Sequence, residues 1–205
     1  MRLYDITPVV SERLAVWPGD TPASREVLLD IEAGDNLTLS TLRATVHLGA
    51  HADAPSHYGA AAPTIEQRPL ERYLGPAQLI RVQVDRGRRI SPGMLGQLRG
   101  TERVLLCTAT FPEPDAFNED FAALSTELIE HLHGQGVTLI GIDTPSVDLF
   151  DSKSLPAHRA CLEHDMAILE GLVLAPVPAG LYELIALPLP LVGFDASPVR
   201  AVLRD

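Results

Sequence analysis

Hydrophobic and polar positions alternate or cluster over short segments of this chain, which predicts many β-strands and few helices. Strands are predicted at residues 3–6, 26–31, 37–45, 77–84, 103–108, 137–143, 166–174 and 197–203. The second and third of these flank a turn at residues 34–36 and are typical of a hairpin. The runs at 103–108 and 137–143 are continuously apolar, which is typical of strands covered on both faces.

Helices are predicted where start and stop residues frame a helical pattern. Residues 125–134 begin at Ser125, a good capping residue, and end at Gly134, a helix stop. Residues 156–164 begin at Pro156, which suits the first turn of a helix. Shorter helical patterns occupy residues 65–74 and 92–98.

The pattern of elements favours an α+β fold. Strands are numerous, helices are few, and the two do not alternate regularly. Pro188 and Pro190 interrupt the apolar stretch 181–190, which predicts an edge strand or an irregular segment because proline cannot donate to a sheet. No linker, repeat or low-complexity segment divides the chain, so residues 1–205 are predicted to form a single domain.

Composition and charge narrow the class of protein. The chain is 46% hydrophobic and 21% charged, as is ordinary for a globular protein. A net charge of −11 argues against nucleic-acid binding, which requires clustered Lys and Arg. No apolar stretch has the length of a signal peptide or membrane span, so we expect a cytoplasmic protein with no membrane partner. Cys107 and Cys161 are expected to be buried, reduced thiols because they form no CxxC pair.

Candidate chemistry concentrates at residues 47–58, where four metal-binding side chains occur within eleven residues. Imidazole and carboxylate donors without a thiolate are typical of zinc or manganese sites. Gly49 and Pro55 interrupt any helix, so we expect a strand that leads into a loop where the first three donors converge. A chance grouping of loop histidines is the alternative. The four side chains are His47, His51, Asp53 and His57.

His158 and Glu170 form a second pair of candidate donors. Glu170 is the only acid in the apolar run 167–174, and a buried carboxylate requires a metal or a charged partner such as Arg159. On one unbroken helix the two residues would lie about 18 Å apart. A shared site therefore requires the helix to end and the chain to return as a strand. The alternative for His158 is a histidine that simply occupies a helix start.

Three further residues carry candidate roles. Trp17 is the only tryptophan and precedes the turn residues Pro18 and Gly19, so it is either a buried anchor or one wall of an aromatic pocket. Asp143 and Asp148 follow a predicted buried strand and either orient ligand histidines or cap turns.

The spacing HxGxHxDxPxH at residues 47–57 resembles the signature of the cyclase-like metal-dependent hydrolase family. The surrounding sequence most resembles the bacterial kynurenine formamidase branch of that family. The resemblance covers nearly the whole chain, although many members outside this branch have Thr where this sequence has Ala50. The other matching segments are VWPGD at 16–20, GIDTPSVD at 141–148, LPAH at 155–158 and ILEGL at 168–172.

The resemblance implies a swivelling β/β/α fold, a homodimer and an arylformamidase activity. The implied reaction is hydrolysis of N-formyl-L-kynurenine to L-kynurenine and formate in tryptophan degradation. The resemblance also implies that Trp17 contacts the aromatic ring of the substrate and that His57 acts as general acid and base. It further implies that the metal ligands are His47, His51, Asp53, His158 and Glu170.

Five donors that include two carboxylates exceed the needs of one tetrahedral zinc, so we expect two zinc ions per chain, with manganese as the alternative metal. The resemblance assigns Asp53 to bridge the two ions. Two other functions stay open. One is hydrolysis of another aryl or cyclic amide, such as isatin. The other is a non-catalytic metal-binding module, but the presence of His57 beside the ligand set argues against it.

Overall fold

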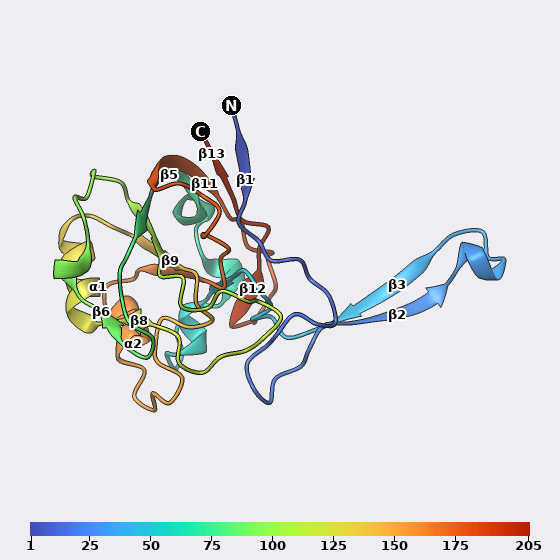
Figure 1. The fold of residues 1–205 in the computed structure, drawn as a ribbon. Helices are drawn as coiled ribbons and strands as arrows, with labels where there is room; N and C mark the ends of the chain where they lie inside the picture. Colours follow the sequence, from blue (N-terminus) through green and yellow to red (C-terminus); the bar gives the residue numbers. More distant parts are fainter.

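A nine-stranded mixed sheet organises the chain in the computed structural model, which describes residues 1–205 (Figure 1). Its strands run in the order β1-β13-β11-β5-β7-β9-β10-β4-β12. The four strands from β5 to β10 in this order are parallel, and the strands outside them are antiparallel. Their bounds are β1 (Leu3–Asp5), β4 (His51–Asp53), β5 (Leu74–Arg81), β7 (Arg103–Cys107), β9 (Leu139–Ile142), β10 (Ala167–Glu170), β11 (Gly180–Ile185), β12 (Ala196–Pro198) and β13 (Val202–Arg204).

Two helices cover one face of this sheet. Helix α1 (Thr126–Gly134) begins where the Ser125 hydroxyl accepts a hydrogen bond from the Leu128 amide, as predicted for this capping residue. Helix α2 (Pro156–Glu163) begins at the predicted proline. Neither helix has the length or the apolar character that crossing a membrane would require. Two small sheets complete the fold: β2 (Ser24–Leu29) with β3 (Leu39–Arg43), and β6 (Arg89–Ile90) with β8 (Ala123–Leu124).

Successive residues of the central strands enter two different cores. Leu105 of β7 packs in one core and Leu106 in the other, and Leu139 and Ile140 of β9 divide in the same way. Side chains alternate between the faces of a strand, so a strand covered on both faces must be apolar throughout. The expected α+β class, with helices on one face of a sheet, is therefore confirmed.

The sheet is strongly curled, as its connectivity requires. Strand β12 is ninth in the sheet order and β13 is second, so a flat sheet would separate them by seven strand spacings, or about 34 Å. Only residues 199–201 join them, and the four peptide steps from Pro198 to Val202 reach about 14 Å at most. Val199 donates its amide proton to Ala50 beside β4, while Ala201 accepts from Ile6 beside β1. The two ends of the sheet therefore approach each other over one core.

Several predicted elements differ from the structure. Residues 181–185 form β11, an interior strand between β13 and β5, because both prolines lie beyond its end. The predicted strand at 197–203 divides into β12 and β13, and the predicted helix at 92–98 is only a 3₁₀ turn at Pro92–Met94. Two βαβ units, β7-α1-β9 and β9-α2-β10, are also present. Both cysteines are free and buried, as expected.

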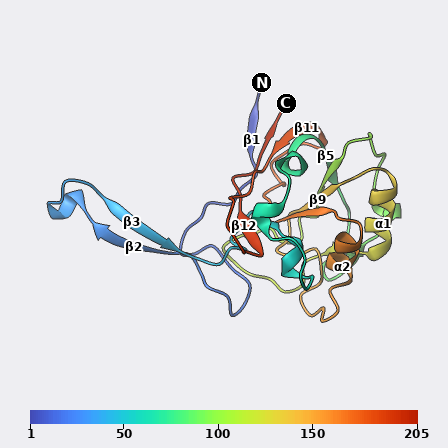
Figure 2. The same ribbon diagram turned by 180° about the vertical axis from the view of Figure 1, so that it is seen from behind.

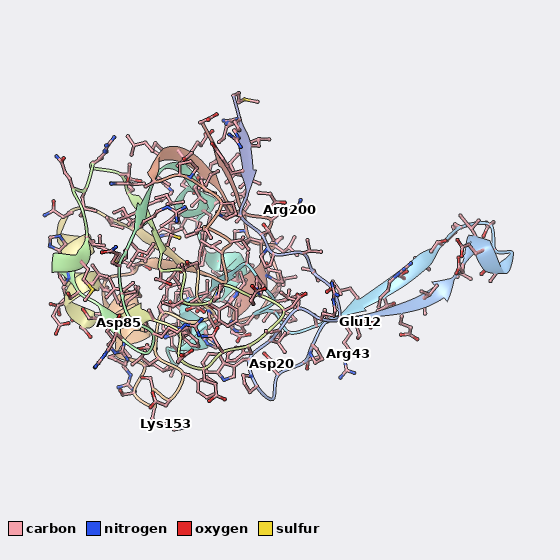
Figure 3. The ribbon with its side chains drawn as sticks, viewed as in Figure 1. Glu12, Asp20, Arg43, Asp85, Lys153 and Arg200 are labelled. Atoms are coloured by element: carbon pink, nitrogen blue, oxygen red, sulfur yellow. The ribbon has the colours of Figure 1, made fainter.

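The predicted hairpin forms an arm that projects away from the body, as two opposite views show (Figures 1 and 2). Strands β2 and β3 pair only with each other, and every residue in them is exposed. Arg43 lies at the base of the arm, and the side chains beyond it extend into open space (Figure 3). The exposed apolar residues of the arm are Val27, Leu28, Leu29, Ile31, Leu37, Leu39 and Leu42.

Gly171 permits a close approach of two backbone segments beside β4 and β10. It has a φ of +65°, and a Cβ atom at this position would lie 2.1 Å from the carbonyl oxygen of Gly49. No side chain larger than hydrogen fits between the turn at Gly171, which follows Glu170, and the turn at Gly49, which precedes His51.

We expect Gly171→Ala to lower the free energy of unfolding by about 1–3 kcal/mol more than Gly87→Ala, because steric overlap in a packed interior costs that much. Gly87 is a matched control, since its φ is +68° and a Cβ there meets nothing within 4 Å. Urea denaturation of both variants measures the difference. Equal losses would show that left-handed backbone strain accounts for the whole effect.

Candidate metal centre

Strand β4 carries two of the predicted ligands on one face. His51 and Asp53 are two residues apart, so their side chains point the same way, while Ala52 between them enters the core. In the pairing of β4 with β10, Glu170 lies directly opposite His51. The register therefore brings Nε2 of His51 to 3.4 Å from Oε2 of Glu170.

Helix α2 delivers His158 to the same place. The Asp148 carboxylate accepts hydrogen bonds from the backbone amides of Ala157 and His158 at the helix start, and from Nδ1 of His158 at 2.9 Å. Arg89 pairs with the same carboxylate at 2.8 Å. The imidazole is thereby fixed with Nε2 directed at the cluster, 3.5 Å from Oδ2 of Asp53.

His47 approaches Asp53 from the other side. The chain turns at Gly49, which has a φ of +56°, and the Gly49 carbonyl oxygen lies 2.8 Å from Nδ1 of His51. Nδ1 of His47 lies 3.1 Å from Oδ1 of Asp53. The two carboxylate oxygens of Asp53 thus face different histidines.

Buried polar atoms in this cluster lack hydrogen-bond partners. Asp53 is 1% exposed, yet neither of its carboxylate oxygens has a hydrogen-bond donor, and Nε2 of His51 is also unpaired. A buried carboxylate without a partner is costly, whereas a bound cation would satisfy all three atoms. The donor set of imidazoles and carboxylates is the one that zinc and manganese accept. The residues present therefore fit a divalent metal ion.

The charges of the cluster favour binding of a cation. Burial opposes the charged form of His47, but the carboxylates of Asp53 and Asp195 outweigh it and raise the pKa of this imidazole to about 9. Burial likewise opposes a charge on His158, whose pKa is raised to about 10 by Asp148 and Asp53. Without a metal, protons therefore compensate the carboxylates, and metal binding displaces them.

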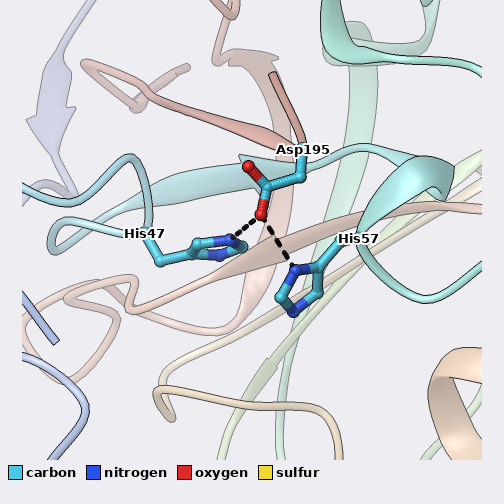
Figure 4. A group of neighbouring side chains, drawn as sticks. All are labelled: His47, His57 and Asp195. Atoms are coloured by element: carbon cyan, nitrogen blue, oxygen red, sulfur yellow. Dashed lines mark hydrogen bonds and ion pairs between the residues drawn. The ribbon is translucent and has the colours of Figure 1, made fainter. Parts of the chain in front are cut away.

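Asp195 joins His57 to this cluster. Its Oδ2 lies 3.0 Å from Nε2 of His47 and 3.2 Å from Nδ1 of His57, so one oxygen serves both rings (Figure 4). Partial burial disfavours the charged form of Asp195, but hydrogen bonds from His47 and His57 outweigh this effect and lower its pKa. Three overlapping sets have donor atoms within 4.8 Å of one another: His47, His51 and Asp53; His47, His57 and Asp195; and Asp53, His57 and His158.

A cavity of about 540 Å³ opens in front of the cluster. Its lining includes His57 and Glu170 from the cluster and the aromatic side chains of Trp17, Phe111 and Phe117. The Trp17 ring packs on Phe117 at 5.6 Å between centroids. Trp17 is therefore both packed against other aromatic rings and part of the cavity wall.

The structure brings all five residues predicted as ligands into one cluster, with His57 beside it. Their roles as ligands and catalyst stay predictions. Of the two aspartates predicted to orient histidines or cap turns, Asp148 contacts His158, whereas Asp143 instead accepts bonds from Thr108 and Ala109. Burial raises the pKa of Asp143. Nothing in the sequence indicates Asp195, whereas the Phe- and Pro-rich stretch 111–121 indicates an aromatic wall.

Comparison with known sequences gives the family. A sequence model described as putative cyclase matches residues 4–149. The chain belongs to the cyclase family. Within this family it is 45% identical over 206 residues to a kynurenine formamidase of Bordetella petrii, covering 100% of this chain and 98% of the relative. A kynurenine formamidase of Maricaulis maris is 44% identical over 207 residues, with the same coverage.

Solved structures agree with membership of the cyclase family. A potential metal-dependent hydrolase with cyclase activity superposes with a TM-score of 0.84 at 29% identity, covering 98% of this chain and 96% of the other. A predicted metal-dependent hydrolase from Bacillus stearothermophilus gives 0.81 at 31% identity, covering 98% and 97%. Isatin hydrolase A from Labrenzia aggregata gives 0.85 at 22% identity, covering 98% and 93%, a likeness of fold alone. The expected cyclase-like fold is confirmed.

In this cyclase-family protein we expect Asp148→Asn to weaken metal binding about 10- to 100-fold, the usual cost of losing a carboxylate that orients a ligand imidazole. Asp143→Asn is the matched control, because Asp143 is also a buried acid but contacts no histidine of the cluster. Competition with a chromophoric chelator measures both affinities. Equal weakening in the two variants would mean that general destabilisation, not the orientation of His158, is responsible.

Proposed function

We propose that this protein is a metal-dependent arylformamidase that hydrolyses N-formyl-L-kynurenine to L-kynurenine and formate in tryptophan degradation. The observation that carries the proposal is 45% identity, over the whole chain, to a kynurenine formamidase. The site supports it independently, because one cavity combines an aromatic wall with a cluster of imidazoles and carboxylates. Such a cavity suits a substrate that has both an aryl ring and a hydrolysable carbonyl group.

The aromatic wall suits the ring of the substrate. Trp17, Phe111 and Phe117 offer flat and edge surfaces for an aryl ring, and aromatic pairs of this kind contribute about 0.5–1.5 kcal/mol beyond their buried area. With the ring held there, the formamide group is directed across the cavity towards His57 and Glu170. We therefore assign Trp17 as a substrate-contacting residue.

The ligand set we propose is His47, His51, Asp53, His158 and Glu170, holding two zinc ions. The position of Asp53 supports two ions, because Oδ1 faces His47 and Oδ2 faces His158 at 3.1 and 3.5 Å. A carboxylate with its two oxygens directed at separate donor groups is arranged to bridge. When bound, divalent ions would lower the pKa of a water molecule from about 15.7 towards 7 and stabilise negative charge on the formyl oxygen.

His57 is the group that moves protons. It lies at the cavity with Nδ1 engaged by Asp195, which leaves Nε2 free to act on water and substrate. Nε2 accepts a proton from water as the water oxygen bonds to the formyl carbon. It then donates that proton to the arylamine nitrogen as the carbon–nitrogen bond breaks, releasing formate and kynurenine. General acid-base catalysis of this kind contributes about 10²–10⁴-fold.

Loss of absorbance of N-formyl-L-kynurenine, with growth of that of kynurenine, tests the activity of metal-loaded protein. In this assay His57→Ala should lower turnover by roughly 10²-fold or more while retaining most of the metal, because a proton-transfer group is lost and no ligand is. Asp53→Ala should lose metal and turnover together, since the buried charge that holds the ions is gone. Elemental analysis supplies the metal content.

Three results would overturn these assignments. Turnover of isatin but not of N-formyl-L-kynurenine would show that the protein hydrolyses cyclic amides instead. Metal loss in His57→Ala equal to that in Asp53→Ala would make His57 a ligand and leave proton transfer to another residue. A metal-free protein with activity insensitive to chelators would exclude the metal-dependent mechanism.

We also propose a homodimer in which the β2–β3 arm packs against a second copy of the chain. A two-stranded hairpin alone is marginally stable in water, and this arm exposes apolar residues along its length, including Ile31 and Leu42 at 60% and 67% exposure. The Pro-rich tail exposes a second apolar surface with Leu189 and Phe194. In a two-fold dimer each copy presents both surfaces, so the arm of one chain has a receptor on the other.

Light scattering at micromolar concentration should find a dimer for the natural chain and a monomer for the double variant Ile31→Glu/Leu42→Glu, because charges on the arm oppose its burial. Met94→Glu is the control: it also adds a charge at an exposed apolar residue, 42% exposed, but lies on the 3₁₀ turn of residues 92–94, outside the arm. A natural chain that is monomeric, or an arm variant that remains dimeric, would refute this interface.

A further inference from the structure

One oxygen of Asp195 contacts the imidazoles of both His47 and His57 (Figure 4). A carboxylate can only accept hydrogen bonds, so each ring nitrogen that faces it must carry a proton. This requirement places the proton of a neutral His57 on Nδ1 and leaves its Nε2 unprotonated. In His47, Nε2 is the nitrogen that faces Asp195, and Nδ1 is the nitrogen that faces Asp53.

The backbone around Asp195 is held on both sides. The Asp195 carbonyl accepts a hydrogen bond from the Ala54 amide at 2.8 Å, and the preceding Phe194 carbonyl accepts from Ile65 at 3.0 Å. The next residue, Ala196, begins β12 and pairs with Asp53 in the sheet. Asp195 is therefore placed by the same strand pairing that places the cluster.

The His57 ring packs beside that of His47, with 4.2 Å between centroids, but this packing does not select a tautomer. His57 follows Pro55 in a short 3₁₀ turn, and its side chain is 35% exposed. An exposed imidazole without a partner exchanges between tautomers and rotates about its side-chain bonds, so only part of the population presents a free Nε2 to the cavity. The bond to Asp195 is the one side-chain hydrogen bond that the structure gives His57.

We propose that Asp195 is the positioning residue for His57: it holds the Nδ1-protonated tautomer with Nε2 directed into the cavity, and joins this imidazole to His47. The role in turnover rests on the proposed function, whereas the tautomer does not. Asp195 does not line the cavity, whereas His57 does, so Asp195 acts through His57.

A double-mutant cycle tests whether Asp195 acts through His57. At saturating metal, Asp195→Ala should lower kcat about 10- to 100-fold, in the range for residues that orient a functional imidazole, with KM little changed. In the His57→Ala background the same substitution should lower kcat less than about 2-fold, because residues that act as a unit are not additive. Asp195→Asn should recover part of kcat, since its amide oxygen can accept one of the two bonds.

Nitrogen NMR of histidine-labelled, metal-free protein gives a readout that needs no activity. The His57 signal, assigned by its loss in His57→Ala, should report a proton on Nδ1 in the natural chain. In Asp195→Ala the signal should change to the Nε2-protonated form or to a mixture. An unchanged tautomer in Asp195→Ala would overturn the proposal, whatever the substrate of the enzyme proves to be.

Glu66→Ala is the matched control for the loop. Glu66 accepts a hydrogen bond from the Gly193 amide at 3.2 Å and so restrains the same segment, but it contacts no histidine. It should leave kcat and the His57 tautomer unchanged. A loss of kcat equal to that of Asp195→Ala would assign the effect to the loop and overturn the proposal, as would equal fold losses from Asp195→Ala in both backgrounds of the cycle. Inactivity of the natural chain towards the formamide would refute the proposed function alone.

Discussion

The burial of the Asp53 carboxylate is the constraint on which this structure depends. The side chain is 1% exposed and its oxygens have no hydrogen-bond donor, so the free energy of its charge is balanced only by neighbouring imidazoles or by cations. Strand β4, which carries Asp53, is held between β10, which ends at Glu170, and β12, which Asp195 precedes. Both acids face the site. The curl of the sheet, the register of its edge and the placement of α2 all serve to surround this one group.

Local sequence patterns predicted the elements and residues whose placement depends on near neighbours in the chain. The continuous apolar run gave β9, the capping residues gave the start of α1, and the single acid in an apolar segment singled out Glu170, which the register places opposite His51. The chain turns between His158 and Glu170, as predicted, because α2 ends at Glu163 and β10 begins at Ala167. These features depend on residue type and spacing within about twenty positions.

Features set by long-range pairing were not predictable in this way. Asp195 lies 138 residues from His57 in sequence and reaches it only because β12 pairs with β4. Nothing in the residues around Asp195 indicates that partner. The sequence predicts a loop at β4, because three residues are too few to show alternation. It predicts an edge strand or irregular segment at β11 because of prolines that lie beyond the end of this strand. The arm was predicted as a hairpin, but no pattern in its sequence showed that both of its faces would be exposed.

The three-residue link between β12 and β13 has a consequence for synthesis of the chain. Strand β4 is made early, but its outer edge is covered only by residues 196–198, and the other end of the sheet is completed only by residues 202–204. Until residues 196–198 have left the ribosome, β4 is therefore an open edge that bears an acid, and such edges invite pairing with other chains. Closure of the sheet therefore waits for residues 196–204 to leave the ribosome, and loss of residues 196–198 would uncover the edge of the strand that carries His51 and Asp53.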